Sequence, residues 1–267
     1  MMRELGQRSL CVLAAIQAGC ALLAGCNSDS GLGGQLSPVM SAAGSGAAGN
    51  GAAAAGLQVQ LASGALQGKQ VGTTREFLGV PYAKAPIGPL RFAAPQPAEP
   101  WTGVRDATAF GPSCPQPVGA LAAMGQQSED CLSLNVFVPE QASAAKPLPV
   151  MVFIHGGAFT SGGSLQYAGE ALSNAGPVVL VTINYRLGAL GFFSHPALDA
   201  TRAGAPSGSD GIRDQQLALS WVQQNIAAFG GDPRSVTVFG ESAGSMSVSV
   251  HWVSPGSGAL RQRLSME

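Results

Sequence analysis

The sequence predicts an α/β fold with a mostly parallel central sheet flanked by helices. Apolar runs of strand length recur along the chain, and an amphipathic helical pattern separates the last two of them. A further helical pattern follows the last run directly. This alternation favours parallel pairing, because parallel neighbours need a crossover connection that a helix usually supplies.

Six short segments are expected to be strands. Two lie near Leu57 and Leu66 and begin the folded domain, which we expect to span residues 57–267. The central sheet is expected to contain Leu134–Val138, Val150–Ile154, Val178–Asn184 and Ser235–Phe239. The last of these is a β-branched apolar run, which suits a buried strand.

The helix between the last two strands is expected to run from about Ile212 to Phe229. Its apolar residues recur at helical spacing and form one face, made of Leu219, Val222, Ile226 and Phe229. Gly230 and Gly231 follow, and glycine is common at the end of a helix. We assign this face and Trp221 to the core.

Residues 235–250, SVTVFGESAGSMSVSV, place a serine at a tight turn between a strand and a helix. The pattern G-x-S-x-G has little weight by itself in a chain with 37 glycines. Here a buried strand precedes it, Gly240 and Gly244 stand where a sharp turn excludes side chains, and an apolar helix follows. This arrangement raises a serine hydroxyl above the sheet of an α/β-hydrolase, so we predict that Ser242 is a catalytic nucleophile.

Further segments carry a family resemblance. They are Glu129–Val138 (EDCLSLNVFV), Pro149–Phe159 (PVMVFIHGGAF), Val179–Phe193 (VLVTINYRLGALGFF) and Asp214–Gly244 (DQQLALSWVQQNIAAFGGDPRSVTVFGESAG). Together with GVPYAKAPIG at Gly79, they resemble the N-terminal half of a type-B carboxylesterase, the cholinesterase-like branch of the α/β-hydrolases. The family implies hydrolysis of carboxylic esters through an acyl-enzyme, with a serine, an acidic residue and a histidine in that chain order.

The resemblance also implies an oxyanion hole. The carbonyl oxygen of an ester becomes negative in the tetrahedral intermediate, so catalysis needs preorganised N–H donors beside the nucleophile. The expected donors are the backbone groups of Gly157, Ala158 and Ala243. Gly156 and Gly157 allow the loop after the Val150 strand to approach closely, and the alanine at 158, where the family often has glycine, keeps its backbone donor. Taken alone, the HGG segment would also fit an ordinary turn.

The nucleophile has no evident base in this sequence. Members of the family are longer and carry their catalytic acid and histidine beyond the nucleophile, so we expect this chain to be truncated after the elbow and to lack both. Its histidines are His155, which resembles the family's structural histidine, His195 in a loop, and His251. His251 follows Ser242 by about 13 Å along a helix, beyond hydrogen-bond reach, and is expected on the helix surface or in packing. Glu241 is expected to be structural.

Three functions are compatible with this pattern. The first is a serine carboxylesterase of which this chain is the N-terminal half. The second is a truncated fragment without activity. The third is a non-catalytic cholinesterase-like binding module, against which the serine argues. Truncation would also leave an open sheet edge and uncovered apolar surface after Leu264.

The first residues have the pattern of a bacterial lipoprotein signal. Arg3 and Arg8 precede an uncharged apolar run, Leu10–Ala24, which is too short for a comfortable membrane span. The run ends in LAGC, which resembles the lipoprotein cleavage box, so Cys26 is the expected lipidation site. An ordinary secretory signal with an incidental cysteine is the alternative. Asn27 is not the aspartate associated with inner-membrane retention, so an anchor in the outer membrane is expected rather than one in the inner membrane. A periplasmic or secreted protein is the alternative.

After the signal peptide of residues 1–26, residues 27–56 are rich in glycine, alanine and serine and have few large apolar groups. Such a segment buries too little surface to order itself, so it is expected to be a flexible tether. A coil of this length typically spans about 30 Å, enough to hold a domain clear of a membrane.

The cysteines agree with export. Cys11 and Cys20 fall inside the signal, and Cys26 is the lipidation candidate. Cys114 and Cys131 remain, and their placement matches the family's first disulfide. An even pair in an exported chain favours a bridge, with two free buried thiols as the alternative.

Charged residues make up 11% of the chain, and the formal net charge is −1. No basic face is available, so nucleic-acid binding is not expected. The resemblance implies that Arg91 with Glu129 and Arg186 with Asp214 are buried ion pairs, with solvated surface charge as the alternative. No cluster has metal-ligand spacing, so neither a metal nor a cofactor is expected. The expected partners are a small-molecule ester and, through the lipid anchor, a membrane.

Overall fold

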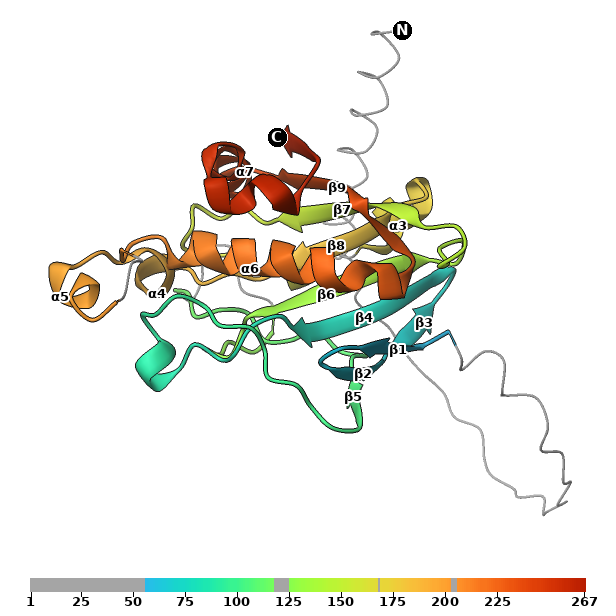
Figure 1. Cartoon of the computed structure of the whole chain (residues 1–267), viewed down its shortest axis with the longest axis horizontal. Helices are drawn as coiled ribbons and strands as arrows, with labels where there is room; N and C mark the ends of the chain where they lie inside the picture. Colours follow the sequence, from blue (N-terminus) through green and yellow to red (C-terminus); the bar gives the residue numbers. More distant parts are fainter. Residues whose placement is uncertain (1–55, 118–124, 168, 203–205) are drawn as a thin grey trace, which may run out of the picture. The chain divides into compact units, whose positions relative to one another are not determined.

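The computed structural model describes residues 56–117, 125–167, 169–202 and 206–267. Its main feature is a central sheet of seven strands (Figure 1). In order across the sheet, the strands are β10 (Arg263–Met266), β9 (Gly231–Gly240), β7 (Leu148–Ile154), β8 (Val179–Ile183), β6 (Ser133–Pro139), β4 (Thr74–Pro81) and β3 (Lys69–Val71). The predicted signal peptide, the lipidation site at Cys26 and almost all of the predicted tether lie outside the described residues.

The sheet is mixed. The four strands β10, β9, β7 and β8 pair in parallel, whereas β8–β6, β6–β4 and β4–β3 pair antiparallel. β3 and β4 form a tight hairpin, which needs no crossover helix. The expected α/β fold with helices flanking a central sheet is confirmed, and its parallel part is the part that carries the crossover helices.

A smaller sheet contains β1 (Gln58–Leu61), β2 (Gly64–Gln67) and β5 (Val104–Asp106). β1 and β2 are the short strands expected near Leu57 and Leu66. They pair antiparallel, and β5 joins β2 in parallel. Val59, Leu61 and Leu66 are buried, so this sheet contributes one apolar face to the core.

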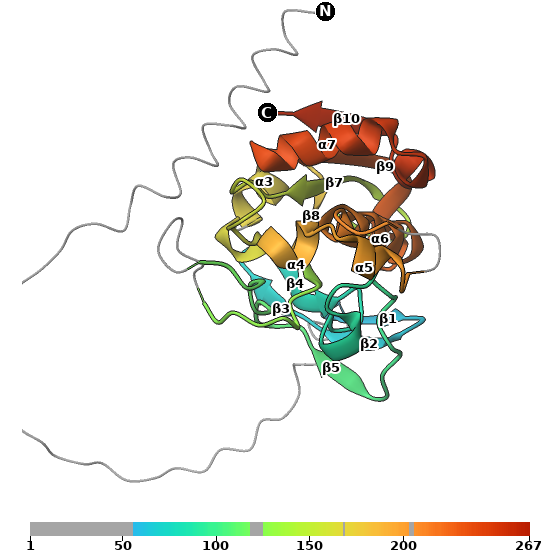
Figure 2. The same ribbon diagram turned by 90° about the vertical axis from the view of Figure 1, so that its left-hand side faces the viewer.

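Helices cover both faces of the central sheet. α3 (Glu170–Ala175) connects β7 to β8, and α6 (Asp210–Asn225) connects β8 to β9. These crossovers run in opposite directions across the sheet, and crossovers of this kind are right-handed, so α3 and α6 lie on opposite faces (Figure 2). Within the described ranges, the other helices are α4 (Gly188–Phe192), α5 (Pro196–Asp199), α7 (Ala243–Val253) and the 3₁₀ turns η1 (Gly88–Leu90), η2 (Ser164–Gln166), η3 (Ile226–Phe229) and η4 (Pro255–Leu260). Among the described residues, no helix combines the length and the apolar character that a bilayer crossing requires.

The long helix confirms its expected apolar face. Leu219, Val222, Ile226 and Phe229 are all buried in the core. The α-helical part ends at Asn225 and tightens into η3, and Gly230 then adopts φ 84°. Because this left-handed conformation disfavours residues with a Cβ atom, the glycine ends the helix and directs the chain into β9.

Apolar side chains are exposed near the edge of the central sheet that β10 forms. β10 pairs with β9 and has no second neighbour in the described part of the sheet. Large apolar residues of α7 and β10 are exposed, namely Met246, Val250, Trp252, Val253 and Met266. The sequence predicts uncovered apolar surface after Leu264, where Met266 lies; the other four exposed residues lie before it, on α7.

One of the two expected ion pairs is buried and the other is not. Arg186 and Asp214 form a bidentate pair at 2.7 and 2.8 Å, with side chains 2% and 0% exposed. Arg91 and Glu129 also pair, at 2.6 and 2.9 Å, but their side chains are 45% and 28% exposed. The expectation of burial for the second pair is therefore wrong, because Arg91 follows η1 on the surface.

We expect Asp214→Asn to lower the free energy of unfolding by about 3–5 kcal/mol, because it leaves the buried guanidinium of Arg186 without its counter-charge. The matched substitution Glu129→Gln removes the exposed pair and should cost about 0–1 kcal/mol. Urea unfolding at neutral pH compares the two variants. Equal losses would contradict a structural role for the buried pair.

Candidate active site

Ser242 lies on a strained turn between β9 and α7. Its backbone has φ 56° and ψ −118°, a conformation that costs a non-glycine residue about 1–3 kcal/mol. Only Glu241 and Ser242 separate the strand from the helix. Ser242 is exposed, although Ala243 and Gly244 directly after it are buried. The turn therefore exposes the serine to solvent, while the residues directly after it are packed in the protein interior.

The two glycines of the turn are required by close packing. A Cβ atom at Gly244 would lie 2.0 Å from the carbonyl oxygen of Ile154, at the end of β7. A Cβ atom at Gly240 would lie 2.5 Å from the backbone of Gly244. Both distances are far below a van der Waals contact, so a side chain at either position would displace the turn.

The loop after β7 lies directly against this turn. A Cβ atom at Gly156 would be 2.5 Å from Glu241 Oε2 and 3.1 Å from Ser242 Cβ. Gly157, Ala158 and Phe159 then follow with φ of 100°, 54° and 59°. Three successive residues with positive φ make a compact loop, whose first glycine, Gly156, packs against the serine turn.

Backbone donors in these two segments are unoccupied. Thr160 and Ser161 donate their N–H groups back to the carbonyl oxygen of Gly157, each at 3.0 Å. The N–H groups of Gly157, Ala158 and Ala243 donate no hydrogen bond within the described part of the chain. Such donors can stabilise an oxygen that becomes negatively charged beside Ser242.

His155 supports the loop after β7 from inside the protein. Its Nδ1 donates to the carbonyl oxygen of Gly156 at 2.8 Å, and its ring stacks on Tyr185 with 4.4 Å between centroids. The Tyr185 hydroxyl donates to the His155 carbonyl oxygen at 2.9 Å. Burial lowers the pKa of His155 to about 4, so the ring is neutral at neutral pH.

His251 lies inside the protein between α7, α6 and η4. Its Nε2 donates to Gln215 Oε1 at 2.9 Å, so its Nδ1 accepts from the Ser257 hydroxyl at 2.8 Å. Burial, with a smaller effect from Arg261, lowers its pKa to about 4. Of the two roles expected for His251, packing is therefore correct and helix surface is wrong, because its ring fills the junction of three elements.

None of the three histidines hydrogen-bonds to Ser242 in the described structure. His155 and His251 are engaged as above. His195 is exposed and accepts a hydrogen bond from the backbone of Ala197 at the start of α5. The structure thus places the start of the loop that carries Gly157 and Ala158 against the turn that carries Ser242 and Ala243, and no described histidine hydrogen-bonds to the serine.

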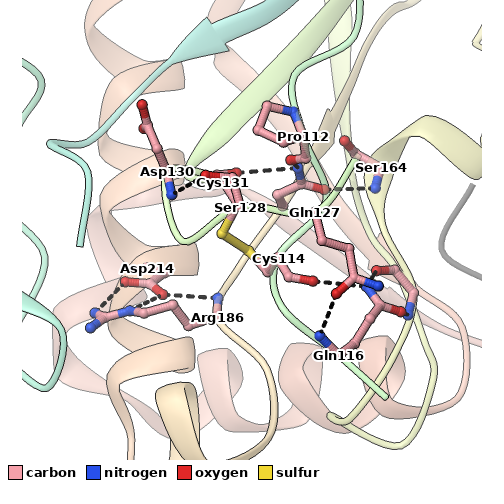
Figure 3. The surroundings of a disulfide bond; sticks show 12 residues. Pro112, Cys114, Gln116, Gln127, Ser128, Asp130, Cys131, Ser164, Arg186 and Asp214 are labelled. Carbon is pink, nitrogen blue, oxygen red and sulfur yellow. Dashed lines mark hydrogen bonds and ion pairs between the residues drawn. A yellow bond between two sulfur atoms is a disulfide. The ribbon is translucent and has the colours of Figure 1, made fainter. Parts of the chain in front are cut away.

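Cys114 and Cys131 form a disulfide, as the family resemblance implies (Figure 3). Both sulfur-bearing residues are buried in the core. Figure 3 shows the bond beside the Arg186–Asp214 pair and above Gln116. Among the described residues, no group of three or more His, Cys, Asp or Glu side chains gathers in a way that could hold a metal ion.

Sequence reasoning missed the side chains that hold these backbone segments. Tyr185 could have been found, because it follows a parallel strand at the sheet end where such folds place their sites. Gln116 lies in an irregular segment, and Gln215 lies within the helical pattern of α6. Gln116 belongs to no motif, and Gln215 lies in a family segment whose pattern does not indicate its partners, so only the folded arrangement reveals their contacts.

Comparison with known proteins places most of the chain in one group. The profile of the carboxylesterase family matches residues 55–266. The para-nitrobenzyl esterase of Bacillus subtilis is 48% identical over 210 residues, covering 75% of this chain and 42% of that protein. The cocaine esterase of Oryctolagus cuniculus is 50% identical over 204 residues, covering 72% of this chain and 37% of that protein.

The solved structures agree with this similarity. A thermophilic PNB esterase matches with a TM-score of 0.72 at 45% identity, covering 78% of this chain and 43% of that one. This chain thus spans less than half the length of these relatives. The likeness confirms the α/β-hydrolase architecture expected from the sequence.

We expect stability to fall as the pH is lowered from 6.5 towards 4. The pKa values of His155 and His251 are about 4 in the folded chain and about 6.5 when unfolded, so the unfolded chain binds more protons in this window. Each histidine should contribute ~3 kcal/mol that is present above pH 6.5 and lost as the pH approaches 4.

Urea unfolding of the wild type and of His251→Gln at several pH values checks this expectation. The variant should lose less stability between pH 6.5 and 4 than the wild type does. His195→Gln is the control for replacing an exposed histidine. A pH dependence that is identical in the wild type and His251→Gln would show that His251 does not remain neutral in the fold.

Proposed function

Because the chain belongs to the carboxylesterase family, we propose that Ser242 is the nucleophile of a serine hydrolase that cleaves small carboxylic esters through an acyl-enzyme. One observation carries the proposal: Ser242 sits on a strained turn against a glycine loop with unused N–H donors. The esterase names of its relatives support the same chemistry.

In the proposed reaction, Ser242 Oγ attacks the carbonyl carbon of the ester. The carbonyl oxygen takes up the negative charge and accepts hydrogen bonds from Gly157, Ala158 and Ala243. Collapse of this intermediate expels the alcohol and leaves the acyl group on Ser242. Water then attacks the acyl carbon, releases the carboxylic acid and regenerates the serine.

A general base is a further requirement of the proposal. A serine hydroxyl is a weak nucleophile near neutral pH and needs a base within about 3 Å to take its proton. The histidines of this chain form hydrogen bonds with groups other than Ser242, namely Gly156 for His155, Ala197 for His195 and Gln215 for His251. We therefore assign the base and its acidic partner to polypeptide beyond these 267 residues in a complete esterase, consistent with the greater length of the relatives.

We expect residues 1–267 alone not to turn over p-nitrophenyl acetate or butyrate, and an extended chain that supplies the base to do so. Ser242→Ala should lower kcat of the extended enzyme by about 10⁴-fold or more. Ser245→Ala, three residues further along in α7, is the matched control. Because apolar side chains of α7 and β10 are exposed, residues 1–267 should also be poorly soluble.

Two outcomes would refute this assignment. Undiminished turnover by Ser242→Ala in the extended enzyme would exclude Ser242 as the nucleophile. Full turnover by residues 1–267 that disappears on Ser242→Ala would require a base within these residues. Low residual activity from the oxyanion donors alone is compatible with the proposal.

From the sequence we further propose that Cys26 is the lipidated first residue of the mature protein, anchored to the outer membrane, with residues 27–56 as its tether. Two or more acyl chains suffice for stable anchoring. Mass spectrometry of membrane-fraction protein should find residues 1–25 removed and acyl mass on Cys26. Cys26→Ser should release the protein from the membrane. A soluble mature protein cleaved at another position would contradict the proposal.

A further inference from the structure

Gln116 connects the disulfide loop to the loop after β7. Its side-chain Nε2 donates to the carbonyl oxygen of Gly162 at 2.8 Å and to that of Cys114 at 3.0 Å. Its Oε1 accepts the backbone N–H of Gly162, also at 2.8 Å. The side-chain amide thus pairs with both polar groups of Gly162, as a neighbouring strand would, from a position two residues after the disulfide (Figure 3).

Gly162 in turn packs against the start of the loop. A Cβ atom at Gly162 would lie 2.7 Å from His155 Nδ1 and 2.8 Å from the carbonyl oxygen of Gly156. A Cβ atom at Gly157 would lie 2.1 Å from the carbonyl oxygen of Ser161. These contacts leave no space for a side chain, so a displacement of Gly162 towards the start of the loop should shift the peptide between Gly156 and Gly157.

That peptide carries one of the proposed oxyanion donors. His155 Nδ1 holds the carbonyl oxygen of Gly156. The N–H of Gly157 belongs to the same planar trans peptide and points in the opposite direction. The contacts that hold the Gly156 carbonyl group therefore also orient the N–H of Gly157. These contacts include the hydrogen bond from His155 and the packing of Gly162.

The disulfide loop is itself anchored to the central sheet. Cys114 is bonded to Cys131, which precedes β6. The carbonyl oxygen of Cys131 accepts from Asn184 Nδ2 at 3.2 Å, directly after β8. Asn184 Oδ1 also accepts the N–H of Ser164 at 2.8 Å. Gln116 is therefore supported, through the disulfide, by residues beside the central sheet.

We propose that Gln116 is a positioning residue for ester hydrolysis: supported by the disulfide, its amide holds Gly162 and thereby orients the Gly157 donor. This inference rests on the proposed function for its catalytic consequence, and on the contacts above for its structural part. Fixed donors stabilise the intermediate without reorganisation, so loosening them should lower kcat and leave ground-state binding nearly unchanged.

Amide hydrogen exchange tests the structural part without requiring turnover. In residues 1–267, Gln116→Ala should make the N–H groups of residues 160–162 exchange at least about tenfold faster than in the wild type. The matched control is Gln223→Ala, since this half-buried glutamine donates to the carbonyl oxygen of Leu260 at 3.1 Å, on α6 and away from the loop. The control should leave these residues unchanged.

Gln116→Glu distinguishes the paired hydrogen bonds from simple packing. An ionised carboxylate still accepts from Gly162 N–H but cannot donate to its carbonyl oxygen, whereas the protonated acid can do both. Relative to wild type at each pH, exchange in Gln116→Glu should therefore be fast at pH 8 and closer to the wild-type rate at pH 5, where a larger fraction of the carboxyl groups is protonated. The exchange rate of Gln116→Ala, divided by the wild-type rate at the same pH, should not change between pH 8 and pH 5.

In an extended, active esterase, Gln116→Ala should lower kcat about tenfold and leave KM within about twofold. Unchanged exchange at residues 160–162 in both Gln116 variants would overturn the proposal, as would faster exchange without any loss of kcat. The proposal would also be overturned if the exchange rate of Gln116→Glu relative to the wild type were the same at both pH values. Loss of the proposed function would appear separately, as full activity of Ser242→Ala with the exchange results intact.

Discussion

The site depends on the contact between two backbone turns at the carboxyl ends of β7 and β9. A Cβ atom at Gly244 would lie 2.0 Å from the carbonyl oxygen of Ile154, and one at Gly156 would lie 3.1 Å from Ser242 Cβ. Only hydrogen fits at these positions, so the glycines let two separate segments share one small space. The parallel pairing of β7 with β9 sets the register that brings Ile154 level with Gly240.

The surroundings hold these turns in conformations that they would not adopt alone. Ser242, Ala158 and Phe159 have positive φ, at a cost of about 1–3 kcal/mol each. Neutral buried groups, rather than charges, provide the support: His155 and Tyr185 lie below the loop, and His251 with Gln215 lies behind α7. Neutral hydrogen-bonded groups can occupy a dry interior at a smaller desolvation cost than ions. Serine and donors are thereby held rigidly while the serine stays accessible.

The sequence was sufficient for the framework and for the strand–turn–helix segment that carries Ser242. Strands, the amphipathic α6 and the serine turn follow from periodicity and from glycine positions, because these features are local along the chain. The disulfide and the buried Arg186–Asp214 pair came from the family resemblance. The exposure of Arg91 and Glu129 and the burial of His251 did not follow, because both depend on which elements pack together. The same limit hid Gln116, whose contact at Gly162 lies 46 residues away.

A crystal structure of the active esterase after reaction with a p-nitrophenyl phosphonate ester tests the arrangement most directly. The phosphonyl oxygen of the adduct occupies the place of the oxyanion. We expect phosphorus bonded to Ser242 Oγ, and this oxygen within about 2.7–3.1 Å of the N–H groups of Gly157, Ala158 and Ala243. An adduct on a different residue, or a phosphonyl oxygen bound by other groups, would contradict the proposed site.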